Sequence, residues 1–110
     1  KPFGSGSCQR GLPGDYYSTS RFVRAAYVNA NYPAQDTEED NVSRMFHSLQ
    51  QVAMVDGCAR MGDGAFEKTV YTGCFSSRTN SYYFNTYDDQ TVHAYHLADY
   101  PQEGTEPIVA

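Results

Sequence analysis

The stretch GLPGDYYSTSRFVR, residues 11–24, joins a turn rich in glycine and proline to a cluster of small hydroxyl residues, which leads into a predicted helix. Arg21 lies in the first turn of that helix, where a cation faces the positive end of the helix dipole and Asp or Glu is expected. Arg21 therefore either meets a specific anionic partner or is a tolerated surface arginine. Physical reasoning alone favours the second interpretation.

The first predicted helix runs from about Ser18 or Ser20 to Asn31, and Pro33 ends it. Apolar residues recur along it every four positions, which predicts a single core-facing side. The residues of this predicted apolar face are Phe22, Ala26 and Ala30, with Val23 and Tyr27 beside them.

A second helix is predicted between Thr37 and Gly57. Thr37 is a candidate N-cap, the acidic residues 38–40 suit the first turn, and Asp56-Gly57 is a typical C-terminal signal. We expect its apolar stripe to be core packing rather than a cofactor-binding surface. That stripe consists of Val42, Met45, Phe46, Leu49, Val52 and Ala53.

Beyond a loop predicted over residues 57–64, the apolar period changes to two, which is typical of strands. The three predicted strands span residues 66–75, 82–87 and 92–97, with turns at 76–80 and 88–90. This order predicts one α+β domain, in which two helices are followed by a three-stranded antiparallel meander.

The remaining segments are predicted to be irregular, with a loop over residues 1–17 and a tail over residues 98–110; the two helices occupy 18–56 and the strands 65–97. Both faces of the predicted sheet carry apolar or aromatic residues, and two helices can cover only one of them. The sequence therefore predicts that the chain packs against further polypeptide. Because it starts at Lys1, we expect it to begin inside a longer gene product or to be processed.

Composition excludes several classes of function. The net charge is -5 on 110 residues with no basic stripe, which argues against a nucleic-acid partner. No apolar run reaches membrane-spanning length, so no membrane partner is predicted. The cysteines Cys8, Cys58 and Cys74 are too widely spaced for a disulfide framework or a CxxC metal site, and we interpret them as buried or incidental thiols.

The histidines do not suggest a metal site either. His47 lies beside the stripe of the second helix and is predicted to be a hydrogen-bonded structural residue. His93 and His96 are three apart on a predicted strand, so their side chains point to opposite faces. Asp88 and Asp89 suit a turn, where Asp bonds to the local backbone. We expect neither a metal nor a cofactor.

Several motifs resemble the choloylglycine hydrolase family, which includes conjugated bile salt hydrolases and penicillin V acylases. The most specific are GLPGD at residues 11–15 and SRFVRAA at 20–26. Four further segments follow in the family's order, and the likeness spans about Gly4 to Leu97. These are FH at 46–47, VAMVDG at 52–57, YTGC at 71–74 and YYFNTYD at 82–88.

The resemblance implies an N-terminal-nucleophile hydrolase with an αββα sandwich, which cleaves a C–N amide bond through an acyl-enzyme. The family's nucleophile is an N-terminal cysteine whose own α-amine is the base, and an arginine in the Ser-Arg-Phe motif belongs to the active site. By resemblance, Arg21 is that catalytic residue; substrate-binding residues stay unassigned. The family also implies a bacterial homo-oligomer, a tetramer, of the cytoplasm or the periplasm.

The chain lacks the family's other active-site residues, which are an N-terminal cysteine, an Arg and an Asp shortly after it, and two asparagines. Cys8 follows seven residues and is not N-terminal. Residues 1–110 are therefore expected to be the C-terminal portion of one such domain, inactive alone, whose partners are the remainder carrying the cysteine and a small-molecule amide. The alternative is a non-catalytic interaction module derived from the same fold. The choice among bile salts, penicillin V and acyl-homoserine lactones stays open.

Overall fold

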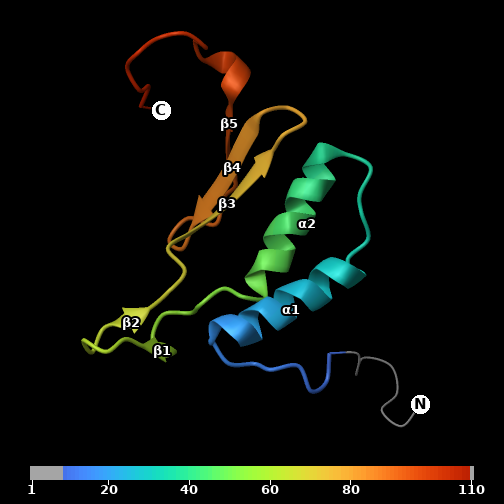
Figure 1. The fold of residues 1–110 in the computed structure, drawn as a ribbon, viewed down its shortest axis with the longest axis vertical. Helices are drawn as coiled ribbons and strands as arrows, with labels where there is room; N and C mark the ends of the chain where they lie inside the picture. Colours follow the sequence, from blue (N-terminus) through green and yellow to red (C-terminus); the bar gives the residue numbers. More distant parts are fainter. Residues whose placement is uncertain (1–8, 110) are drawn as a thin grey trace. The chain divides into compact units, whose positions relative to one another are not determined.

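The computed structural model describes residues 9–109, so Ala110 and the first eight residues of the loop predicted over 1–17, with Cys8, lie outside the described residues. The chain divides into two compact units, Lys1–Thr69 and Val70–Ala110. The first unit contains two helices and a two-stranded sheet, and the second contains a three-stranded antiparallel sheet (Figure 1). The predicted α+β class, with two helices followed by a three-stranded meander, is confirmed.

Helix α1 spans Ser18–Asn31, which confirms the predicted start and end. Its predicted apolar face, in contrast, does not form a core in this chain. Phe22 is 73% exposed, and Ala26 and Ala30 are exposed one and two turns further on. A polar contact instead links α1 to the residue that follows the second helix, because Arg24 Nε donates to the Gln51 carbonyl at 2.9 Å. The spacing of apolar residues in the sequence does not predict this polar contact, because an arginine makes it.

Helix α2 spans Glu38–Gln50 and begins as predicted. The Oγ1 of Thr37 accepts a hydrogen bond from the Asp40 amide at 3.1 Å, and the first turn carries three acidic residues. Val42 and Phe46 on its stripe are buried, which confirms their core role. Met54, which follows the helix, is the third buried hydrophobic residue among residues 9–109.

Replacing Thr37 by alanine is expected to lower the free energy of unfolding by about 1 kcal/mol, because the first turn of α2 loses its side-chain acceptor. Urea denaturation of the 110-residue chain measures this loss. Thr37→Ser keeps a hydroxyl at the same position and should stay close to the parent. Equal losses in the two variants would show that the hydroxyl does not cap the helix.

The predicted end of the second helix at Asp56 is wrong, since α2 ends at Gln50. In a longer helix the Gln51 carbonyl would accept from the Val55 amide. Here Arg24 Nε occupies that carbonyl, and the Val55 amide donates to the Tyr16 hydroxyl oxygen at 3.4 Å. The Arg24 side chain thus takes the place of the helical donor at the Gln51 carbonyl, and the Tyr16 side chain takes the place of the helical acceptor at the Val55 amide.

The segment after α2 contains a small hairpin where a loop was predicted. Strands β1, Ala59–Arg60, and β2, Phe66–Glu67, pair antiparallel. The predicted strand over residues 66–75 is also wrong as one element, because it is broken after Glu67. The break follows from Thr69, whose amide donates to the Met54 carbonyl at 3.0 Å and whose Oγ1 accepts from the Met54 amide at 2.8 Å.

The second unit is the predicted antiparallel meander, in the order β3-β4-β5. Its strands are β3, Tyr71–Ser76, β4, Ser81–Thr86, and β5, His93–His96. Burial alternates along β3, as a period of two requires. Among residues 70–109 the buried residues are the polar Ser81 and Asn85, and no hydrophobic side chain is buried.

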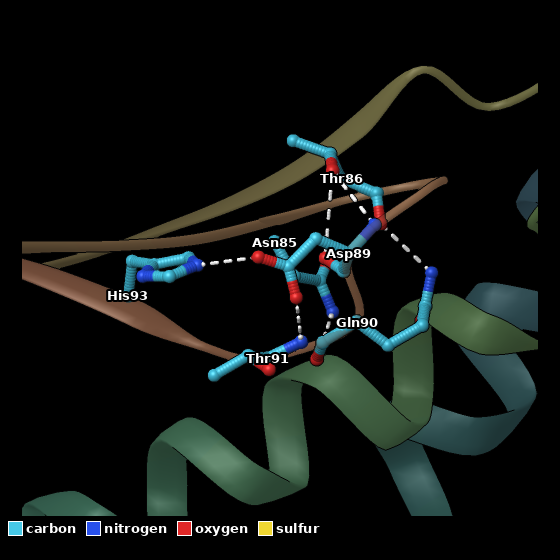
Figure 2. Close-up of polar contacts among 6 residues, drawn as sticks. All are labelled: Asn85, Thr86, Asp89, Gln90, Thr91 and His93. Carbon is cyan, nitrogen blue, oxygen red and sulfur yellow. Dashed lines mark hydrogen bonds and ion pairs between the residues drawn. The ribbon is translucent and has the colours of Figure 1, made fainter.

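Asp89 organises the turn between β4 and β5 (Figure 2). Its amide donates to Thr86 Oγ1 at 3.0 Å, its Oδ1 accepts from the Thr91 amide at 3.0 Å, and its Oδ2 pairs with His93 Nε2 at 2.9 Å. The hydrogen bond from His93, and then that from the Thr91 amide, lower the pKa of Asp89 below its usual value. The prediction that an Asp side chain in this turn bonds to the local backbone is confirmed for Asp89.

Candidate functional site

Arg21 is the fourth residue of α1, and a single described hydrogen bond orients its side chain. Its Nε donates to the Tyr16 carbonyl at 3.0 Å, and its own amide donates to the Tyr17 carbonyl at 2.9 Å. The side chain is half-buried. Within residues 9–109, its two terminal nitrogens donate no hydrogen bond. The guanidinium is thus held at one edge, and its other edge makes no hydrogen bond among the described residues.

Asp15 supplies the negative charge that the sequence lacks inside the first turn of α1. Its Oδ1 accepts from the Tyr17 amide at 2.9 Å, and its Oδ2 accepts from Ser20 Oγ at 2.9 Å. The hydrogen bond from the Tyr17 amide, and then that from Ser20, lower the pKa of Asp15 below its usual value of 3.8. The carboxylate is therefore ionised at neutral pH beside the positive end of the helix.

The role of Asp15 was not foreseen from the sequence. The available signal was an Asp two residues before Tyr17, since such an aspartate often accepts from the backbone amide two positions on. The cap of α1 consequently comes from outside the helix rather than from its N-cap residue, Tyr17, whose side chain makes no capping bond.

An open groove of about 670 Å³ lies on the first unit, beside the loop that carries Asp15. It is lined by residues 14–17, Met54, residues 58–60 and Glu67. Cys58 is a free and exposed thiol on this groove, which fits an incidental rather than a buried thiol, whereas Cys74 is half-buried. Arg21 is not among the described residues that line the groove.

Each of the three histidines bonds to a nearby polar group. The Nδ1 of His47 lies 2.8 Å from the Ser43 carbonyl, one turn earlier on α2, which fits the predicted structural role. His96 Nδ1 lies 2.7 Å from the Oγ of the buried Ser81. Within residues 9–109, no group of three or more His, Cys, Asp or Glu side chains is arranged to hold a metal ion. None of the described helices is long and apolar enough to cross a membrane.

The sequence model of the linear amide C–N hydrolases known as the choloylglycine hydrolase family matches residues 1–110. The chain belongs to the choloylglycine hydrolase family. It is 55% identical over 106 residues to the bile salt hydrolase/transferase of Bifidobacterium longum, which covers 96% of this chain and 33% of that protein. It is 43% identical over 107 residues to the conjugated bile acid hydrolase of Lactobacillus acidophilus, covering 97% and 34%.

Two solved structures share the fold of this chain. A crystal structure of a variant conjugated bile acid hydrolase from Clostridium perfringens matches with a TM-score of 0.77 and 32% identity, over 94% of this chain and 32% of that one. Penicillin V acylase from Agrobacterium tumefaciens has a TM-score of 0.67 at 18% identity, over 84% and 30%, which shows the shared fold alone. The predicted family is confirmed, and the chain spans about a third of the length of the curated relatives it matches.

Proposed function

We propose that this chain is the C-terminal third of an amide hydrolase whose nucleophile, an N-terminal cysteine, lies in the remainder of the enzyme. The observation that supports this best is the geometry of Arg21, which the Tyr16 carbonyl holds at Nε while its terminal nitrogens donate no bond within residues 9–109. Membership of the family and the coverage of about a third of each relative support the same proposal.

The proposed reaction begins with attack of the cysteine sulfur on the carbonyl carbon of the amide. The cysteine's own α-amine, with an ordinary pKa of about 7.7–8.0, accepts the thiol proton and returns it to the departing nitrogen as the C–N bond breaks. The acyl group then rests on sulfur as a thioester, which water cleaves to the free acid. No cofactor is needed for either half of this reaction.

Arg21 is the residue that this chain contributes to that reaction. A guanidinium beside the thiol favours the thiolate and lowers the thiol pKa. It can equally hold the oxygen of the tetrahedral intermediate, where negative charge develops. Both roles require a fixed cation with unoccupied donors, and among residues 9–109 the contact with Tyr16 leaves Nη1 and Nη2 in that state.

Conjugated bile salts are the substrate class we propose, since the relatives at 55% and 43% identity are named for bile salts and bile acids. Penicillin V is the second candidate, because the family that the motifs resemble includes penicillin V acylases. The enzyme is further proposed to be a homo-oligomer, which light scattering of the full-length protein would test.

The full-length hydrolase is expected to release glycine from glycocholate, whereas the isolated 110-residue chain releases none. Amino-acid release and loss of penicillin V are measured for both proteins at equal molar concentration. A full-length variant with serine in place of the N-terminal cysteine is the control for the nucleophile. Activity of the isolated chain would contradict the missing nucleophile. A full-length protein inactive on both substrates would instead favour the non-catalytic interaction module.

A further inference from the structure

Arg24 donates hydrogen bonds to three main-chain carbonyls, which belong to two segments far apart in the sequence. Its Nη1 donates to the Pro13 carbonyl and to the Asp15 carbonyl, both at 2.7 Å, and its Nε donates to the Gln51 carbonyl at 2.9 Å. Hydrogen bonds from a charged donor are roughly twice as strong as neutral ones. Arg24 therefore fastens the loop before α1 to the residue that follows α2.

The same loop orients Arg21. The Asp15 carbonyl that Arg24 holds directly precedes the Tyr16 carbonyl that accepts from Arg21 Nε at 3.0 Å. The two arginines lie one helical turn apart on α1, so they bind neighbouring carbonyls of a single loop. At its other end, Tyr16 accepts at its hydroxyl oxygen from the Val55 amide at 3.4 Å.

We propose that Arg24 is a positioning residue for Arg21, because it fixes the Pro13–Asp15 loop against the end of α2 and thereby places the Tyr16 carbonyl that orients the Arg21 guanidinium. This inference rests on the proposed function of Arg21. A long side chain such as arginine loses much rotamer freedom when it is held in one geometry. Because the Tyr16 carbonyl is already fixed, the Arg21 side chain loses part of this rotamer freedom before substrate binds. A preorganised hydrogen-bond donor requires this early loss.

Lysine cannot reproduce this arrangement at position 24. Its ammonium is a compact point charge, whereas the guanidinium spreads its donors over a planar fork that reaches the loop and the Gln51 carbonyl together. Arg24→Lys therefore keeps the charge and breaks the bridge between the two segments. This variant separates the positioning role from a general electrostatic one.

The test is a double-mutant cycle in the full-length hydrolase, with Arg24→Lys made in the parent and in an Arg21→Ala background. In the parent, kcat on glycocholate should fall about 10- to 100-fold with KM changed less than about twofold, as expected for a misplaced reacting group. In the Arg21→Ala background, Arg24→Lys should cause no further fall in kcat, because no guanidinium remains to be positioned.

Arg44→Lys is the matched control. Arg44 also donates to main-chain carbonyls, at 3.1 Å to Tyr32 and at 3.3 Å to Asn29, but it lies on α2 and touches no residue of the Pro13–Asp15 loop among those described. It should change the melting temperature as Arg24→Lys does and leave kcat unchanged. If Arg24→Lys gives no folded enzyme, Arg24→Gln takes its place, since an amide N–H can still donate to one loop carbonyl.

The outcomes distinguish the two proposals. An equal fall in kcat from Arg24→Lys in both backgrounds, or an unchanged kcat in the parent, would overturn the positioning role while Arg21 stays catalytic. An Arg21→Ala variant that keeps the parent kcat on glycocholate would overturn the catalytic role proposed for Arg21, and the positioning role with it, while the proposed amide hydrolysis would stand. Loss of kcat in the parent alone, with Arg44→Lys fully active, supports the positioning role.

Discussion

Replacing Arg21 by alanine in the full-length hydrolase is expected to lower kcat on glycocholate by about 10²–10³-fold, while the melting temperature stays close to that of the parent. This is the loss typical of removing one preorganised donor to a developing negative charge. The fold should tolerate the change because the side chain is half-buried and its one described hydrogen bond goes to the Tyr16 carbonyl.

Steady-state kinetics and thermal melting are compared for Arg21→Ala, Arg21→Lys and Arg44→Ala. Arg21→Lys keeps a positive charge but loses the planar fork, so an intermediate kcat is expected. Arg44→Ala removes a different arginine that binds main-chain carbonyls and should affect melting more than kcat. A fall in kcat that follows the fall in melting temperature across all three variants would show that Arg21 is merely structural.

The pH dependence of kcat/KM separates the two roles proposed for Arg21. If the guanidinium stabilises the thiolate, its removal raises the thiol pKa, and the acidic limb of the profile moves to higher pH. If it only binds the oxygen of the tetrahedral intermediate, the rate falls equally at every pH and the limb stays in place. An unmoved limb would therefore assign Arg21 to the oxyanion.

Local signals are sufficient to predict where both helices begin. The hydroxyl cluster after Tyr17 marks the start of α1, and Thr37 with the acids behind it marks the start of α2. The three-stranded meander also follows from a period of two and from turns rich in Asp and Asn. Such features depend on residues within a few positions of one another.

Features that depend on distant partners could not be predicted. The end of α2 is set by Arg24 at the Gln51 carbonyl and by Tyr16 at the Val55 amide, and neither bond leaves a trace in the local pattern. The break before β3 has the same cause, because Thr69 pairs with Met54 instead of continuing the strand.

In the candidate site too, one part is predictable from the local sequence and another part depends on contacts that the local sequence does not show. Arg21 is predictable from a motif, because the Ser-Arg-Phe segment resembles a known family. Its orientation is not predictable, because it depends on the Tyr16 carbonyl and on the bonds that Asp15 and Arg24 make around it. The apparent conflict of a cation in the first turn of α1 is also reduced by Asp15, which places a carboxylate at the same helix end.

Phenylalanine at positions 46 and 22 provides the largest expected contrast in stability. Phe46 is 7% exposed and belongs to a core of three buried hydrophobic residues among those described, whereas Phe22 is 73% exposed on α1. Phe46→Ala is expected to lower the free energy of unfolding of the 110-residue chain by about 3 kcal/mol, from lost burial and the remaining cavity. Since small domains are stable by only about 5–15 kcal/mol, this is a large fraction of the total.

Phe22→Ala removes the same atoms from an exposed site and should change the free energy of unfolding of the same chain by less than about 0.5 kcal/mol. Urea denaturation of both variants measures the difference, and similar losses would contradict the assignment of the core. The pair is also informative in the full-length hydrolase. If the proposed remainder of the enzyme covers α1, Phe22→Ala becomes destabilising there while Phe46→Ala keeps its effect, because burial rather than residue type sets the cost.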